Sequence, residues 1–220
     1  MRFVAVSVVL HLALRRCRLG WGQTMIMKRS TTKFTQIDAA TDLSTRVGVL
    51  LYDNSIDVDA ILAAAVADAR ARGIAVAGLL QRFGPRLDSG KRSMWVDDIQ
   101  TAQTIRLDAP RGPGAQACIL DPDALSRAAC LLQRATESDA ELIVVNRFGN
   151  AEADGRGMRA EFAGAICAGA AVLVAVRYSL LNDLEGFLGG PAYLLLPQPT
   201  AIANWAEAIV AQDHAQKLRL

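Results

Sequence analysis

The stretch that most constrains the fold is residues 141–157, where a run of apolar residues leads directly into a polar loop rich in glycine. Residues 142–145 are apolar, three of the four are β-branched, and Asn146 and Arg147 follow them. A continuous apolar run of this kind is typical of a strand buried on both faces of a parallel sheet. Open α/β sheets bind ligands outside the carboxyl ends of their strands, so we expect a ligand at this loop.

Apolar runs and helical patterns alternate along the rest of the chain. Short apolar runs, typical of buried strands, occur at residues 46–52, 74–80, 171–176 and 193–196. Apolar residues recur at helical spacing in residues 58–69, 125–135, 158–169 and 202–210, and residues 180–187 form a short helical or turn segment. This alternation predicts a three-layer α/β sandwich with a mainly parallel sheet.

Local signals refine this prediction. Asp57 and Asp121 are expected to cap the helices that follow them, and Pro122 suits the first helical position. We expect a hairpin, antiparallel and at a sheet edge, from residues 94–99 and 104–107. Residues 83–93 and 109–114 are expected to be loops, because both contain Gly-Pro or Pro-Gly signals.

Size and charge predict one domain with two extensions. The chain has 220 residues and is 52% hydrophobic, which suits a single well-cored domain. Seven of the 24 basic residues lie in residues 1–37, which contain none of the 22 acidic ones, so the remainder carries 17 basic and 22 acidic residues. We therefore expect a leader at 1–45, an α/β domain at 46–212 and a tail at 213–220. The mildly acidic domain does not indicate a nucleic-acid partner.

The leader admits three interpretations. Its apolar stretch at residues 3–14 is too short to span a bilayer and lacks a signal-peptide cleavage site, so no integral membrane association is expected. The first interpretation is a disordered extension. The second is a start codon assigned too early, with Met25 or Met27 as the true start, and the third is a basic segment that lies on a membrane surface.

The cysteines and histidines argue against several kinds of site. The four cysteines are scattered without a C-x-x-C pair, which indicates neither a zinc site nor a disulfide framework. With only His11 and His214 in the chain, a catalytic triad, a Cys-His dyad and a histidine metal centre are not expected. This cysteine usage fits a reducing cytoplasm best.

The segment after the first strand, residues 53–59, lies where a nucleotide-binding α/β protein would carry its phosphate loop. That loop needs glycines, a lysine and a hydroxyl, whereas this segment has no glycine or lysine and contains Asp53, Asp57 and Asp59. Ordinary P-loop hydrolysis is therefore not expected. A calcium loop is excluded as well, because its sixth and twelfth positions are Val58 and Ala64. Helix capping explains Asp57 and Asp59, which leaves Asp53 and its neighbour Asn54 as candidate site residues.

Residues from two further strands are predicted to join this site. The 146–157 loop combines turn-forming glycines with arginines that suit an oxyanion, and the second strand delivers two polar residues to the same edge of the sheet. The alternative is a solvated crossover in which Glu152 and the arginines pair with one another. The candidates are Gln81, Arg82, Asn146, Arg147, Gly149, Glu152, Gly155 and Gly157.

Once these residues are placed, the chain resembles an uncharacterised bacterial family, domain of unknown function 2478, over about residues 47–209. The family is similar, more distantly, to P-loop nucleoside-triphosphatases of the thermophile type. In those proteins the strand at 142–146 ends in an Asp-Glu pair, and this chain has Asn146 and Arg147 there. The resemblance is carried by residues 51–53, 78–81, 118–121 and 145–149, with Glu152 and residues 155–157.

This resemblance implies a P-loop-NTPase-like scaffold with a degenerate phosphate loop, in proteins that look like accessories near molybdate transport and molybdenum enzymes. The leading hypothesis is a non-hydrolytic protein that binds a small anion or a nucleotide. A divergent nucleotide hydrolase or transferase, with Asp53 or Glu152 as base and Arg147 as charge stabiliser, is the second hypothesis. A regulatory or scaffold protein that acts through a protein partner is the third. A homo-oligomer is left open.

Overall fold

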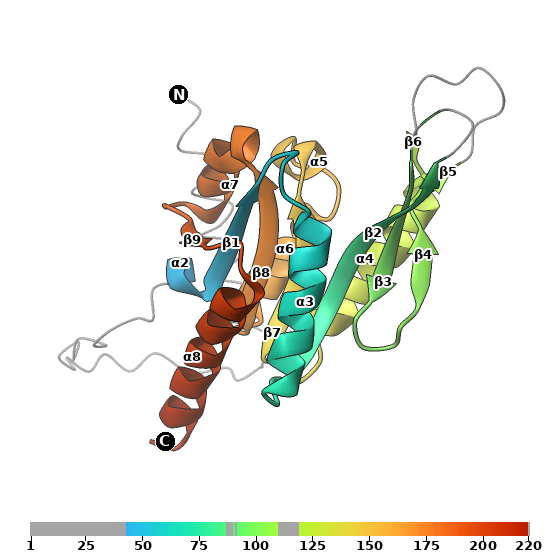
Figure 1. The fold of residues 1–220 in the computed structure, drawn as a ribbon. Helices are drawn as coiled ribbons and strands as arrows, with labels where there is room; N and C mark the ends of the chain where they lie inside the picture. Colours follow the sequence, from blue (N-terminus) through green and yellow to red (C-terminus); the bar gives the residue numbers. More distant parts are fainter. Residues whose placement is uncertain (1–42, 87–89, 91, 110–118, 220) are drawn as a thin grey trace, which may run out of the picture.

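The computed structural model describes residues 43–86, 90, 92–109 and 119–219. Most of the expected leader, residues 1–42, lies outside the described part of the chain. In that part, a mostly parallel sheet is covered by helices on both faces (Figure 1). The predicted α/β fold class is confirmed.

The sheet has seven strands in the order β4-β3-β2-β7-β8-β1-β9. The five strands from β2 to β9 in this order run parallel to one another, and β3 and β4 pair antiparallel at one edge. The strands are β1 (Val47–Tyr52), β2 (Val76–Arg86), β3 (Arg92–Asp98), β4 (Thr104–Arg106), β7 (Leu142–Phe148), β8 (Ala171–Arg177) and β9 (Tyr193–Leu195), and β5 (Asp108–Ala109) and β6 (Ile119–Leu120) form a separate pair.

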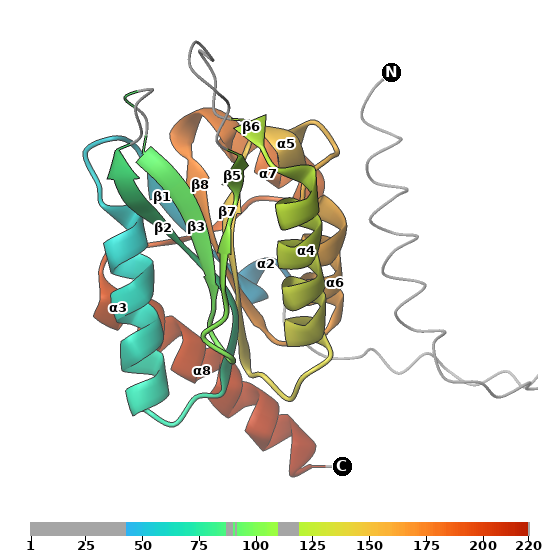
Figure 2. The ribbon, with the colours of Figure 1, turned by 90° about the vertical axis from the view of Figure 1, so that its right-hand side faces the viewer.

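The helices form the two outer layers. One cluster of buried apolar side chains lies between the sheet and α3 (Val58–Ala71) with α8 (Pro199–Lys217). A second lies on the other face, under α4 (Pro122–Thr136), α6 (Arg159–Cys167) and α7 (Leu181–Leu188), as Figure 2 shows for α3 and α4. The short helices are α2 (Leu43–Arg46), α5 (Asn150–Ala153) and the 3-10 turn η1 (Tyr178–Leu180).

The predicted helix caps are confirmed. The Asp57 carboxylate accepts a hydrogen bond from the Ala60 N–H at the start of α3, and the Asp121 carboxylate accepts one from the Asp123 N–H at the start of α4. Pro122 occupies the first turn of α4, where its missing N–H costs no hydrogen bond. Local sequence therefore sets where these two helices begin.

The prediction of a loop at residues 83–93 is wrong at both ends, and residues 87–89 and 91 lie outside the described residues. Strand β2 continues to Arg86 and β3 begins at Arg92, and the two strands pair across a register shift between Phe83 and Arg86. That shift accommodates the Gly-Pro pair that indicated a loop, because a bulge lets an irregular residue leave the ladder. Gln81 and Arg82 thus lie inside a long strand and not at its tip.

Strand β7 is also longer than expected, because it continues past Asn146 through Arg147 and ends at Phe148. Asn146 has a φ of 74°, which lies in the left-handed region, and it follows a register shift between β7 and β8. The short helix α5 follows at once and was not expected from the sequence. Helix α8 continues to Lys217, into the segment expected to be a tail.

Candidate functional site

The carboxyl ends of β1, β7 and β8 meet around the side chain of Tyr52. Tyr52 is the last residue of β1 and lies beside Arg177, the last residue of β8. The guanidinium carbon of Arg147 lies 5.0 Å from the Tyr52 ring centroid, and that of Arg177 lies 5.3 Å from it. The tyrosine is 5% exposed, so it supports two cations from beneath the surface.

Arg147 connects this edge of the sheet to helix α3. Its Nη1 donates a hydrogen bond to the Tyr52 hydroxyl over 3.0 Å, and its Nη2 donates to Asp59 Oδ1 over 2.5 Å. The side chains of Arg147 and Asp59 are 18% and 17% exposed. Asp59 therefore offsets part of the charge that Arg147 brings to the strand ends.

Arg177 is the more accessible cation at this edge. Its side chain is exposed, and its Nη1 donates a hydrogen bond to Asn54 Oδ1 over 3.0 Å. A guanidinium has five N–H donors, so this contact leaves Arg177 with capacity for further acceptors. We call Tyr52, Asn54, Asp59, Arg147 and Arg177 the strand-tip cluster.

The loop between β1 and α3 is held by its own carboxylates. Asp53 Oδ1 accepts hydrogen bonds from the Ser55 N–H over 2.8 Å and from the Ser55 hydroxyl over 2.5 Å. These two bonds, the hydroxyl's first, lower the pKa of the exposed Asp53 carboxyl. Asp57 likewise accepts from the Ala60 N–H. Two backbone donors at the place of a phosphate loop, the N–H groups of Ser55 and Ala60, are therefore bonded within the chain.

Asn146 and Gln81 join β7 to β2. The Gln81 N–H donates to Asn146 Oδ1 over 3.0 Å, and Asn146 Nδ2 donates to Gln81 Oε1 over 3.4 Å. Asn146 is 3% exposed. These side-chain bonds continue the connection between the two strands beyond their last paired residues, Gly78 and Val144.

Glu152 closes the glycine-rich loop. Its Oε2 accepts from the Gly149 N–H over 2.9 Å and its Oε1 from the Met158 N–H over 3.0 Å, and the residue is 8% exposed. A Cβ at Gly157, where φ is +61°, would lie 2.2 Å from Glu152 Oε1, whereas one at Gly155 would meet no atom within 4 Å. The loop is thus built around a buried carboxylate.

The arginines flanking this loop do not pair with Glu152 as the solvated-crossover alternative supposed. Arg156 pairs with Asp154 at the surface. Arg159 Nη1 donates to the Glu152 carbonyl oxygen over 2.7 Å, and its guanidinium carbon lies 4.4 Å from the Phe187 ring centroid. Burial lowers the pKa of Arg159.

Arg82 belongs to a different group of side chains. Its Nε donates to Asp97 Oδ2 over 2.7 Å, and its guanidinium carbon lies 5.3 Å from the Trp95 ring centroid, both on β3. Of the sequence candidates, only Asn54 and Arg147 belong to the strand-tip cluster. Sequence reasoning missed Tyr52, Asp59 and Arg177 as site residues, although Arg177 carries the same signal as Arg147, a cation at the end of an apolar run.

Two negative findings apply to the described ranges. Among these residues there is no group of three or more His, Cys, Asp and Glu side chains placed to hold a metal ion. No helix there is both long and apolar enough to cross a membrane.

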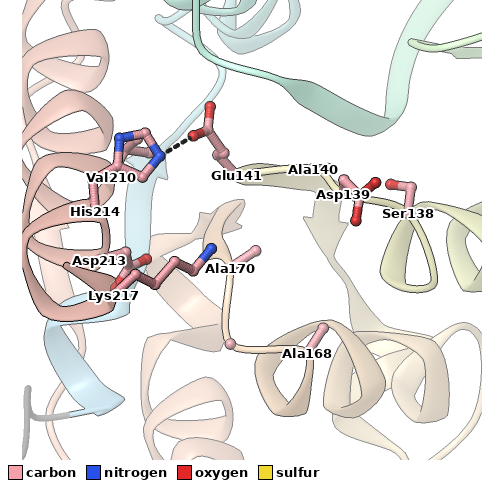
Figure 3. A pocket seen from close by; sticks show the side chains of 11 residues that line it. Ser138, Asp139, Ala140, Glu141, Ala168, Ala170, Val210, Asp213, His214 and Lys217 are labelled. Atoms are coloured by element: carbon pink, nitrogen blue, oxygen red, sulfur yellow. Dashed lines mark ion pairs between the residues drawn. The ribbon is translucent and has the colours of Figure 1, made fainter. Parts of the chain in front are cut away.

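An open pocket of about 300 Å³ lies at the opposite, amino edge of the sheet (Figure 3). It lies beside the residues that precede β7 and β8, and helix α8 forms one wall. His214 Nε2 lies 2.7 Å from Glu141 Oε1 across it, and Asp213 pairs with Arg46 over 2.5 Å. The polar side chains that line it are Ser138, Asp139, Glu141, Asp213, His214 and Lys217.

Comparisons with known proteins give three similarities. Residues 47–205 match a family model described as "Protein of unknown function (DUF2478)". The chain is 35% identical over 182 residues to the molybdenum import ATP-binding protein ModC 2 of Bradyrhizobium diazoefficiens; the match covers 83% of this chain and 20%, about a fifth, of that protein. It is also similar to the solution structure of a human cancer-related nucleoside triphosphatase, with a TM-score of 0.49 and 14% identity, over 77% of this chain and 98% of that one.

Proposed function

We propose that this chain, which belongs to the family described as DUF2478, is a cytoplasmic accessory protein that binds a small oxyanion or a nucleotide without hydrolysing it. The observation that carries the proposal is the pair of guanidiniums, Arg147 and Arg177, whose carbons lie 5.0 Å and 5.3 Å from the Tyr52 ring centroid at the carboxyl ends of the strands. This is the edge at which open α/β sheets bind ligands.

Arg177 is the residue that we assign to the ligand. It is exposed, and its contact with Asn54 leaves other N–H donors in the planar fork that matches an oxyanion. Arg147 adds positive potential from behind, although Asp59 offsets part of it. Asn54 fixes the Arg177 head group, which lowers the entropy lost when an anion binds.

Three features support binding without hydrolysis. The backbone donors of Ser55 and Ala60 are already bonded to Asp53 and Asp57, so the β1–α3 loop has fewer N–H groups to offer a triphosphate. Asn146 and Arg147 occupy the positions at which the resemblance implies a magnesium-organising Asp and a water-activating Glu. The amide of Asn146 bonds Gln81 and the guanidinium of Arg147 bonds Asp59. Phosphoryl transfer depends on such groups facing the phosphates.

The two carboxylates suggested as bases for a divergent hydrolase or transferase are poorly suited to that role. Both oxygens of Glu152 accept hydrogen bonds from backbone N–H groups, and Glu152 is nearly buried. The hydrogen bonds from Ser55 that lower the pKa of Asp53 make it a weaker base. Phosphate release from nucleoside triphosphates that is lost in Arg147→Ala would revive the enzymatic alternative.

The link to molybdenum metabolism is supported by the B. diazoefficiens relative. That protein is named as a molybdenum import ATP-binding protein, and the region similar to this chain makes up about a fifth of it. Joining two units in one chain raises their effective concentration, which benefits units that serve one process. Molybdate is itself an oxyanion, which suits a guanidinium site.

Calorimetry and thermal shift of the full chain with molybdate, tungstate, phosphate, AMP and ATP test the proposal. A ligand at a hundred times its Kd should stabilise the protein by about 2.7 kcal/mol. Arg177→Ala should weaken that binding by about tenfold or more, the loss of one charge-assisted contact. Arg127→Ala, an exposed arginine on α4, is the matched control and should bind as the wild type does. Binding by no ligand, or equal binding by Arg177→Ala, would refute the site.

A further inference from the structure

The pocket at the amino edge of the sheet lies between two walls that come from different parts of the chain (Figure 3). The last turns of α8 form one wall and carry Asp213, His214 and Lys217. The loops that precede β7 and β8, residues 138–141 and 168–170, form the other. Its volume of about 300 Å³ is at the lower end of the range for small-molecule pockets. The size therefore favours a small ligand.

Two pairs of charges at this pocket are already matched within the chain. Asp213 pairs with Arg46 over 2.5 Å, and Glu141 Oε1 lies 2.7 Å from His214 Nε2. The other carboxylate oxygen of Glu141 accepts a hydrogen bond from the Ala75 N–H over 2.9 Å. These contacts join the end of α8 to the sheet, so we do not assign their side chains to a ligand.

Asp139 and Lys217 are the charged groups of the pocket that remain. Among the residues that the structure describes, neither side chain has a hydrogen bond or an ion pair, and the two do not pair with each other. They come from opposite walls, and the Lys217 ammonium points into the space between these walls, toward Ala170, in Figure 3. One carboxylate and one ammonium thus line the same cavity without neutralising each other.

We propose that this pocket binds a small zwitterion of the α-amino acid type, with its carboxylate on Lys217 and its ammonium on Asp139. Each charge of such a ligand meets one group of opposite sign, and hydrogen bonds between charged groups are the strong ones. The Ser138 hydroxyl donates to the Ala135 carbonyl oxygen over 2.8 Å, so its lone pairs stay available to the ligand's ammonium. The site is independent of the strand-tip cluster, which lies at the opposite ends of the strands.

Ligands that carry charge of one sign fit this pocket less well. An oxyanion would gain Lys217 but lie beside the like charge of Asp139, and an organic cation would gain Asp139 but lie beside Lys217. A metal ion finds no suitable set of ligands, since the described residues contain no group of three His, Cys, Asp or Glu side chains placed to hold one. Only a ligand with both charges uses both groups.

Calorimetric titration of the full chain with the protein amino acids, one at a time at millimolar concentration, tests the proposal. At least one should bind. Its N-acetyl derivative and its methyl ester, which each lack one of the two charges, should bind at least about tenfold more weakly. Lys217→Ala and Asp139→Ala should each weaken binding to a similar extent. Asp183→Ala, which removes an exposed carboxylate on α7, is the matched control and should bind as the wild type does.

Both substituted side chains are exposed, so the two variants should keep the melting temperature of the wild type, which separates lost binding from misfolding. Binding by no amino acid, equal binding of either derivative, or wild-type affinity in either variant would overturn the proposal. Lys217→Ala should bind oxyanions as the wild type does, and Arg177→Ala should bind the amino acid unchanged. Failure of this pocket and failure of the oxyanion site are therefore told apart.

Discussion

The guanidinium of Arg147 lies 2.5 Å from the carboxylate of Asp59, a residue 88 positions earlier in the chain. Arg147 comes from the end of β7 and Asp59 from the first turn of α3, so the pair joins the sheet to one of its covering helices. Arg147 Nε is buried and has no hydrogen-bond partner within the described residues. The carboxylate is therefore the main counter-charge of this guanidinium.

Asp59→Ala should destabilise the fold. The substitution leaves a largely buried guanidinium without its counter-charge, which we expect to cost about 2–3 kcal/mol of unfolding free energy. Urea unfolding followed by circular dichroism measures this cost. Asp154→Ala, which removes an ion pair with Arg156 whose side chains are 59% and 75% exposed, is the control and should leave the midpoint unchanged. Equal midpoints for the two variants would mean that the Arg147–Asp59 pair contributes nothing.

Gly157→Ala should cost more than Gly155→Ala. Both glycines have positive φ, +61° and +82°, so alanine adds about 1 kcal/mol of backbone strain at either position. Only at Gly157 does the new methyl group also meet Glu152 Oε1, 2.2 Å away, and disturb the bonds that hold the loop. The loop should then open, and cleavage by trypsin after Arg156 reports that opening. Similar cleavage rates in the two variants would contradict the role of Glu152.

The stability contributed by Asp108 should disappear in acid. Hydrogen bonds from Arg106, and then one from the Met94 N–H, lower the pKa of this carboxyl, while burial opposes them. Because the pKa is lower in the folded state, the contribution is complete above the unfolded value of about 3.9 and is lost as the pH falls through the folded value. Asp108→Asn should thus cost about 1–3 kcal/mol at pH 7. The difference in unfolding free energy between this variant and the wild type, measured by urea unfolding, should shrink below about pH 4. A difference that stays constant down to the acid transition would rule out this linkage.

Much of the fold follows from local sequence. Continuous apolar runs identify β1, β7 and β8, because strands covered on both faces have no polar side to interrupt the run. Asp57 and Asp121 identify two helix starts, because a cap is decided by residues three or fewer positions away.

The partners of the polar side chains do not follow from local sequence. Arg147 and Arg82 look alike as cations near strand ends, yet one pairs with a helix residue and the other with Asp97 on a neighbouring strand. Those choices depend on the order of strands, which the sequence pattern leaves open. The left-handed Asn146 and the backbone bonds of Glu152 are decided by the same long-range packing, so the binding role of these residues stays a prediction.

Truncation after Gln212, the expected end of the domain, should destabilise the protein. Asp213 accepts two hydrogen bonds from Arg46, at 2.8 and 2.5 Å, and His214 lies 2.7 Å from Glu141, so both residues join the end of α8 to the amino edge of the sheet. Arg46 has a side chain that is only 12% exposed and would lose its counter-charge, at a cost of about 2 kcal/mol. A chain truncated after Lys217 keeps both contacts and should have the same melting temperature as the full-length chain. If the two truncated chains have the same melting temperature, the last turn of α8 adds nothing to the stability of the fold.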